Sequence, residues 1–161
     1  MEINHETQLL LRLIRLSGRL QRRKETFVSQ PFEKQTGIHI KHFHALHLIQ
    51  RGFQQPGDLV KEMGLPYSTV SRILDKLLAQ KLIERTANPE DMRQVQLALS
   101  KEGKARYPLA WATYLTCLHE GLGKLPEKEL SETVQALSNL EAIFVAQCEG
   151  DDGLDSKGGA S

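Results

Sequence analysis

The segment from Asp58 to Gly103 constrains the fold of this chain more than any other. Its first part, GDLVKEMG, is a short amphipathic stretch that ends at Gly64. The second part, LPYSTVSRILDKLLAQKLIER, has apolar residues at helical spacing, namely Val70, Ile73, Leu74, Leu77 and Leu78. The third part, TANPEDMRQVQLALSKEG, is typical of two short strands joined by a polar turn at Asn88-Pro89. Two helices, a tight turn and then a β-hairpin are the outline of a winged helix-turn-helix.

The longer of these two helices, from about Tyr67 to Gln80, carries small hydroxyls and basic groups on the side opposite its apolar stripe. These residues are Ser68, Thr69, Ser71, Arg72 and Lys76. Short hydroxyls and an arginine on an exposed helical face suit the base edges and phosphates of a DNA major groove. We therefore expect this face to read DNA.

Length and composition place few limits on function. The chain has 161 residues, 40% of them hydrophobic, and a formal net charge of +1, so total charge does not point to nucleic acid. No apolar run approaches the roughly 20 residues that a membrane span needs, and the N-terminus does not resemble a signal peptide, so we expect a cytoplasmic protein. Two cysteines, Cys117 and Cys148, are too few for a disulfide framework and fit buried or incidental thiols better than redox sensors.

Periodicity predicts helices and strands along most of the chain. The first helix, about residues 5–29, would bury Leu9, Leu13, Leu16, Leu20 and Phe27 and end before Pro31. Further helices are expected at about 40–51, 56–63, 67–80, 101–121 and from 126 onward, with a kink at Pro108, and strands are expected at 82–86 and 94–99. The fold class is therefore mainly α with a small β-hairpin wing.

The long terminal helices do not belong to the winged-helix core, yet their apolar stripes need cover. The simplest cover is a second copy of the chain, which gives a two-fold homodimer. We expect one domain over residues 1–149, with the core at about 38–100 and dimerisation helices at about 5–29 and 101–148. The acidic, small-residue segment 150–161 has no hydrophobic period and is expected to be disordered.

Two pieces of sequence give the chain a family resemblance. STVSRILDKL, Ser68 to Leu77, resembles the recognition helix of the MarR (multiple-antibiotic-resistance regulator) family of bacterial transcription factors. NPEDMRQVQLALSKEG, Asn88 to Gly103, resembles the wing of that family, with its Asp-x-Arg signature at Asp91 and Arg93. The order of helices around the wing is also that of the family.

This resemblance implies a homodimer that binds pseudo-palindromic operator DNA, usually as a repressor, and that a small aromatic or phenolic ligand often releases. It implies base contacts from Ser68, Thr69, Ser71 and Arg72, and minor-groove contact from Arg93. Asp91 would brace the wing by holding an arginine, either Arg93 or Arg85.

The chain departs from the family at Pro66-Tyr67, where a hydroxyl cap and a proline are usual. This difference brings Tyr67 near the phosphates. It also has Lys81 where the family favours glycine before the wing.

An effector cleft is expected at the seam between the dimerisation helices and the winged core. His39, Phe43, Tyr107 and Trp111 are its candidate lining, because an apolar cleft with a few polar groups suits an aromatic acid or a phenol.

Three alternatives remain open at the level of sequence. His39, His42, His44 and His47 have pairwise spacings of three residues, which suits a metal-responsive regulator, although no cysteine or carboxylate stands nearby at ligand spacing. No phosphate-cradling loop, nucleophile elbow or His-Glu metal helix indicates an enzyme, and no cofactor is expected. A winged helix used for protein interaction would need an acidic or apolar exposed face, which Arg72 and Lys76 disfavour.

Overall fold

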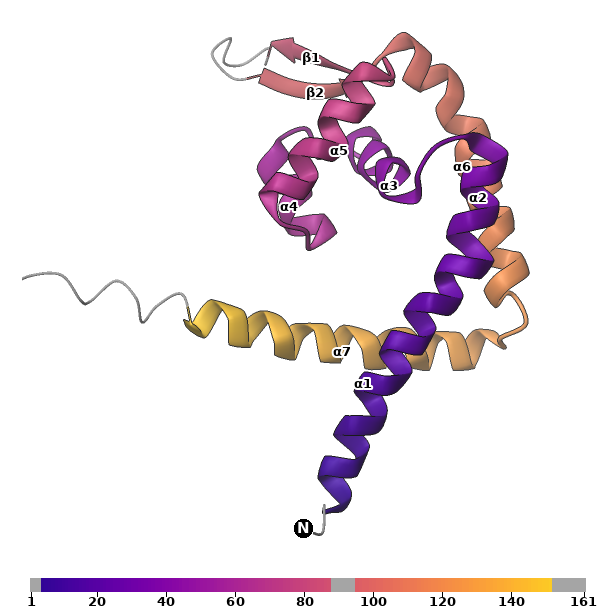
Figure 1. The fold of residues 1–161 in the computed structure, drawn as a ribbon, viewed down its shortest axis with the longest axis vertical. Helices are drawn as coiled ribbons and strands as arrows, with labels where there is room; N and C mark the ends of the chain where they lie inside the picture. Colours follow the sequence, from indigo (N-terminus) through magenta and orange to yellow (C-terminus); the bar gives the residue numbers. More distant parts are fainter. Residues whose placement is uncertain (1–3, 88–94, 152–161) are drawn as a thin grey trace, which may run out of the picture. The chain divides into compact units, whose positions relative to one another are not determined.

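The computed structural model describes residues 4–87 and 95–151 of the chain. The chain divides into two compact units, residues 1–121 and 122–161. Helices dominate the described residues, and the two described strands form one antiparallel hairpin, as predicted (Figure 1). None of the described helices is long and apolar enough to cross a membrane.

The first unit begins with three consecutive helical segments. Helix α1 spans His5–Lys24, a π-helical turn η1 spans Glu25–Ser29, and α2 spans Gln30–Thr36. The prediction that Pro31 ends the helix is wrong. Pro31 lies in the first turn of α2, where a backbone N–H is not needed for helical hydrogen bonding, so the chain stays helical through it. Helix α2 ends instead at Gly37, whose φ of 67° is left-handed.

The winged helix follows, with element bounds close to those expected from sequence. Helix α3 spans Ile40–Gln50, α4 spans Pro56–Met63 and α5 spans Tyr67–Ala79. Strands β1, Ile83–Ala87, and β2, Val95–Leu99, pair antiparallel with Ile83 opposite Leu99. The backbone N–H of Leu97 also donates to the carbonyl of Gln54 at 2.9 Å, so the loop before α4 is tied to the wing.

A single hydrophobic core holds these elements together. Its fully buried side chains come from α2, α3, α4, α5, the start of the wing and α6, and they include Phe32, Phe43, Leu46, Leu59, Leu77 and Leu82. Burying side chains of this size stabilises a fold by roughly 1.5 to 3 kcal/mol each. The positions of α3 and α5 relative to each other are therefore fixed by packing, which matters for the site described below.

The turn between α5 and the wing has a left-handed lysine where glycine would be unstrained. Lys81 has φ of 57°, the only positive φ outside glycine among the described residues. Its N–H donates to the carbonyl of Leu78 and the N–H of Leu82 donates to the carbonyl of Leu77, both at 2.9 Å, which is a Schellman helix end. The expected turn geometry is thus kept, and Lys81 adopts the strained conformation.

Helix α6, Lys101–Leu122, starts against this same turn. The Ser100 hydroxyl donates to the carbonyl of Lys81 and accepts the N–H of Gly103 at 3.0 Å. A Cβ at Gly103 would lie 1.9 Å from the carbonyl oxygen of Leu82, so only glycine fits there. Pro108 lies inside α6, which continues as helix on both sides of it.

The second unit is built around one long helix, α7, Glu127–Asp151. Pro126 precedes it, and its first turn carries Glu127 and Glu129, which suits the positive end of a helix dipole. Apart from the half-buried Leu140, the apolar side chains described in this helix are exposed, with exposed fractions of 57% for Leu137 and 53% for Phe144. Of the tail expected to be disordered, residues 150–161, Gly150 and Asp151 instead form the end of α7, and residues 152–161 lie outside the described residues.

Helix α1 also leaves its apolar stripe uncovered. Leu9, Leu16, Leu20 and Phe27, which the sequence predicts to be buried, are 52%, 38%, 61% and 57% exposed in the single chain. The apolar stripe predicted from the sequence is therefore present. It is uncovered because the helix extends beyond the hydrophobic core of its own unit.

Candidate nucleic-acid interface

Helix α5 buries one side and presents the other, as a recognition helix requires. Val70 and Leu77 are 1% and 0% exposed, and Ile73 and Leu74 are buried with them. The residues predicted to contact DNA lie outside this stripe: Tyr67, Ser68, Arg72 and Lys76 are exposed, and Thr69 and Ser71 are half-buried. Packing of the apolar stripe therefore fixes the direction of the polar face.

The N-terminal end of α5 has no side-chain cap. Pro66 occupies the cap position, and its carbonyl accepts the N–H groups of Thr69 and Val70 at 2.9 and 3.1 Å. Tyr67 follows it with its side chain 65% exposed. A helix start that lacks a capping side chain attracts anions through its backbone N–H groups and dipole. This arrangement supports a role for Tyr67 and Ser68 near a DNA phosphate.

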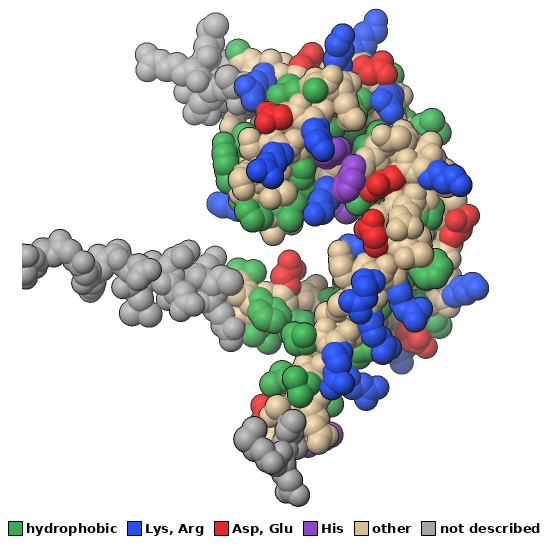
Figure 2. Space-filling view, in the orientation of Figure 1, with side chains coloured by type: hydrophobic (Ala, Val, Ile, Leu, Met, Phe, Trp, Pro, Cys, Tyr) green, Lys and Arg blue, Asp and Glu red, His purple; other side chains and the backbone are tan. Residues whose placement is uncertain are grey.

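A groove of about 510 Å³ runs between the exposed face of α5 and the start of α3. From α5 it is lined by Thr69, Arg72, Asp75 and Lys76, and from α3 by His39, Lys41 and His42. The sequence did not point to Lys41 or His42 as part of this interface, because they lie about thirty residues before α5 and only the packing of the two helices brings them there. Figure 2 shows one face of the molecule on which His side chains lie among basic and acidic ones.

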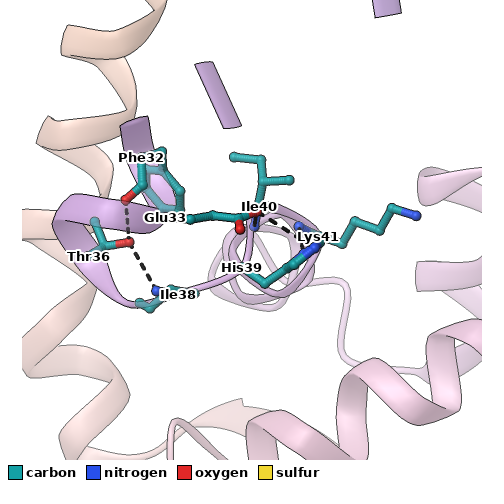
Figure 3. A network of polar contacts seen from close by, with 7 residues as sticks. All are labelled: Phe32, Glu33, Thr36, Ile38, His39, Ile40 and Lys41. Atoms are coloured by element: carbon teal, nitrogen blue, oxygen red, sulfur yellow. Dashed lines mark hydrogen bonds and ion pairs between the residues drawn. The ribbon is translucent and has the colours of Figure 1, made fainter. Parts of the chain in front are cut away.

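Hydrogen bonds at the junction of α2 and α3 fix this end of the groove (Figure 3). The Glu33 carboxylate accepts the N–H of Ile40 at 3.0 Å, and Nδ1 of His39 accepts the N–H of Lys41 at 3.2 Å. Nε2 of His39 lies 3.7 Å from the same Glu33 carboxylate. The Thr36 hydroxyl donates to the carbonyl of Phe32 and accepts the N–H of Ile38. These contacts hold His39 at the groove, apart from Phe43, Tyr107 and Trp111, with which the sequence predicts it to line a cleft.

The electrostatic environment of His42 follows from its place in the groove. Burial lowers its pKa below the usual 6.5, and the nearby His39 and Lys76 lower it further, while Glu33 partly offsets them. Neutral imidazole is therefore favoured in the free protein.

The wing is described only at its base. Arg85 lies exposed in β1, opposite Leu97 of β2. Arg93 and Asp91, predicted to enter the minor groove and to brace the wing, lie outside the described residues.

Three of the four residues proposed to line an effector cleft come together, but as packed core. Phe43 is fully buried and stacks near Tyr107 and Trp111 at ring-centroid distances of 6.2 and 6.3 Å. The His47 ring lies parallel to Trp111 at 4.6 Å, and its Nδ1 is 2.6 Å from the Tyr107 hydroxyl. This cluster packs between α3 and α6, whereas His39 lies at the groove beside α5. An effector cleft lined by these residues stays a prediction.

A cleft does occur on the other side of α3, at the seam with α1. It measures about 350 Å³ and is lined by residues of α1, η1, α3 and α4, among them Lys24, Ser29, Ile40, His44 and Met63, and by Leu65, which follows Gly64 at the end of α4. Sequence periodicity missed it because the lining comes from four separate helical segments, with five residues from α3 and two each from α1, η1 and α4.

His39, which caps α3, and the three histidines within that helix face different neighbours. The His39 and His42 rings lie 5.3 Å apart at the groove, His44 packs edge-on against Tyr114, and His47 stacks on Trp111. Within residues 4–87 and 95–151, no three or more His, Cys, Asp or Glu side chains are grouped to hold a metal ion. Burial lowers the pKa of His44 and His47, with smaller contributions from Lys24 and Arg51 respectively.

Cys117 is fully buried in α6, and burial, aided by Glu120, raises the pKa of its thiol. A buried thiol with a raised pKa is unreactive, as expected for a structural residue. The side chain of Cys148 lies outside the described residues.

Comparisons with known proteins agree with this architecture. Residues 36–94 match the model of the MarR family. A mutant of MarR from E. coli in complex with operator DNA superposes with a TM-score of 0.71 at 22% identity, covering 81% of this chain and 94% of that one. A MarR family regulator from Silicibacter pomeroyi gives 0.74 at 17% identity, covering 88% and 99%.

A third similar structure is CouR from Rhodococcus jostii RHA1 bound to p-coumaroyl-CoA. Its TM-score is 0.67 at 18% identity, covering 86% of this chain and 95% of that one. No curated protein gives a significant match. Residues 36–94 thus match the MarR family of transcription regulators, and the solved structures show that the chain shares the winged helix-turn-helix fold of that family's members.

Proposed function

We propose that this protein is a homodimeric, sequence-specific DNA-binding repressor of pseudo-palindromic operators. The observation that carries the proposal is the exposed face of α5, where Ser68, Arg72 and Lys76 are held outward by the buried stripe beneath them. A helix of this kind fits the major groove, where arginine reads guanine and hydroxyls reach bases or phosphates. The E. coli MarR mutant, which shares the fold, was solved with operator DNA.

The wing supplies the second part of the proposed complex. Arg93 enters the neighbouring minor groove, where it senses groove width, and Asp91 holds Arg93 or Arg85 so that the wing keeps its shape. The exposed position of Arg85 on β1 is compatible with such a pairing.

The homodimer is supported by the uncovered apolar stripes of α1 and of α7. Leu9 and Leu20 of α1 and Phe27 of η1 are each more than half exposed, and so long an exposed apolar stripe is typical of an interaction surface. In the proposed domain organisation, residues 5–29 and 101–148 form the dimer around the core at 38–100. A second copy also brings two α5 helices to successive major grooves about 34 Å apart.

Release by a small aromatic or phenolic ligand is the proposed control. The cleft of about 350 Å³ between α1, η1, α3 and α4 has the size of a ligand site, and it joins the proposed dimerisation helix to the winged core. CouR, of the same fold, was solved with p-coumaroyl-CoA, a phenolic thioester. A ligand that favours one spacing of the two α5 helices would change DNA affinity.

Selection of bound duplexes from a random pool tests the function. The expected product is an inverted repeat with half-site centres about 10 base pairs apart, bound with an affinity that falls steeply with salt. Enrichment of no sequence over the starting pool, at any salt concentration, would contradict sequence-specific binding.

A ligand screen tests the proposed release from DNA. Phenolic acids and their CoA thioesters are screened by thermal shift and then by gel shift. Ligands that stabilise the protein and leave DNA affinity unchanged would refute it.

A further inference from the structure

We propose that the groove between the start of α3 and α5 is a backbone-phosphate site in which Lys41 and His42 bind one phosphodiester beside the recognition helix. The inference rests on the proposed function, because α5 must lie on DNA for a phosphate to reach this groove. It adds a contact outside α5 and the wing, and it makes the affinity for DNA dependent on pH.

The charges of the groove favour an anion. Three fixed cations, Lys41, Arg72 and Lys76, line it against the single carboxylate of Asp75. Lys41, Arg72 and Lys76 are exposed, and none of them has a salt bridge within the described part of the chain. The groove is also open along the exposed face of α5, as a site for a continuous strand must be.

The side chains of the groove, rather than the backbone N–H groups at the start of α3, would bind the phosphate. The first N–H groups of that helix are already used, since Ile40 donates to Glu33 and Lys41 donates to Nδ1 of His39. An entering phosphate would therefore meet the ammonium groups of Lys41 and Lys76, the imidazole of His42 and the hydroxyl of Thr69.

His42 is the group in the groove that gains a proton on binding. Nδ1 of His39 is already engaged as the acceptor of the Lys41 N–H. His42 faces His39, Lys41 and Lys76, with Arg72 and Asp75 along the same groove and Glu33 behind it on α2. In the free protein its burial, and then the neighbouring His39 and Lys76, lower the pKa of His42 and so disfavour its charged form. A phosphate reverses the local field, so the complex takes up a proton that the free protein lacks.

Proton uptake on binding fixes the sign of the pH dependence. Affinity rises as the pH falls, by at most about tenfold per pH unit for each proton taken up. The effect does not depend on base sequence, because phosphates are the same at every step of the duplex.

The test therefore uses a fluorescein-labelled random-sequence duplex of about 30 base pairs at low salt, because phosphate contacts dominate non-specific binding. Anisotropy titrations compare the wild type with His42→Gln, Lys41→Gln and the matched control His119→Gln, whose histidine is exposed on α6. Between about pH 7.5 and about pH 6, we expect at least threefold tighter binding by the wild type and by His119→Gln. His42→Gln should lose most of that gain, and Lys41→Gln should bind more weakly at both values with a salt slope smaller by about 1 per groove.

A direct readout supports the assignment independently of affinity. The imidazole NMR signal of His42 should titrate at higher pH when the duplex is present than when it is absent. An unchanged pH dependence in His42→Gln together with an unmoved titration of His42 overturns this inference, while DNA binding by the protein stands. No binding of any duplex by the wild type at low salt overturns the proposed function itself.

Discussion

At the scale of single residues, Lys81 shows how a local strain is accepted to keep a helix end in place. Its left-handed φ of 57° lets the N–H groups of Lys81 and Leu82 close the Schellman turn. Its carbonyl then receives the hydroxyl of Ser100, so the same residue joins α5 to α6. An L-residue in this conformation costs about 1 kcal/mol or more relative to glycine.

Lys81→Gly should therefore raise the free energy of unfolding by about 1 kcal/mol, measured by urea denaturation. The matched control is Gln80→Gly, at a neighbouring position with an ordinary φ of −77°. That change should lower stability by roughly 0.5 to 1 kcal/mol, because glycine adds freedom to the unfolded chain without relieving strain. Equal effects of the two substitutions would show that the left-handed turn is not strained.

Arg72 and Lys76 provide a second residue-scale comparison on α5. Arg72 has a planar fork of donors that matches a guanine edge, whereas Lys76 is a point charge suited to phosphate. Arg72→Ala should cost about 1 to 3 kcal/mol of binding to the selected operator and relax preference at one base pair per half-site. Lys76→Ala should weaken all duplexes alike. Parallel selections with both variants separate the roles, and a uniform loss with Arg72→Ala would make Arg72 a phosphate contact.

At the scale of elements, α3 connects every part of the first unit. It faces α5 at its start, α6 through the stacked His47 and Trp111, and the cleft at α1 through His44. Its histidines His42, His44 and His47 all have lowered pKa values, with burial as the largest cause. Neutral imidazoles are thus part of the packing of this helix.

This predicts that acid destabilises the protein. Below pH 6.5, the usual pKa of histidine, the unfolded chain binds protons on these imidazoles before the folded chain does. The stability they contribute is complete above pH 6.5 and is lost as the pH falls toward their lowered values. Urea denaturation at a series of pH values should show this decline, with a smaller slope for His44→Gln than for the control His119→Gln. Identical slopes in both variants would exclude His44 as a source.

At the scale of the whole molecule, the exposed stripes of α1 and α7 set the requirement for a partner. The winged helix shares its hydrophobic core with α2 and α6, whereas Leu9, Leu20 and Phe27 lie outside that core. A dimer is the expected solution, since two copies of the same stripe are self-complementary about a two-fold axis.

Leu20→Asp tests this without disturbing the core, because Leu20 is 61% exposed in the single chain. Light scattering at micromolar concentration should find the wild type as a dimer and the variant shifted toward monomer, since a buried carboxylate without a partner is costly. Lys34→Asp, an exposed change on α2, is the control and should remain dimeric. A monomeric wild type, or a variant as dimeric as the control, would contradict the proposed role of α1.

The sequence by itself determined the element types, most of their bounds and the outward face of α5. Periods of 3.6 and 2 residues and the residues at helix ends report local geometry, and Gly64 ends α4 as the sequence predicts. The error at Pro31 arose because proline is compatible with the first turn of a new helix, and the sequence does not reveal that η1 and α2 continue α1.

Only the tertiary structure decided which distant residues share a site. It separated His39 from Phe43, Tyr107 and Trp111, and it brought His39, Lys41 and His42 to the groove beside Arg72 and Lys76. Such neighbours depend on the angle and rotation at which α3, α5 and α6 pack. Those quantities are set by the fit of many buried side chains at once, so no pattern within one segment encodes them.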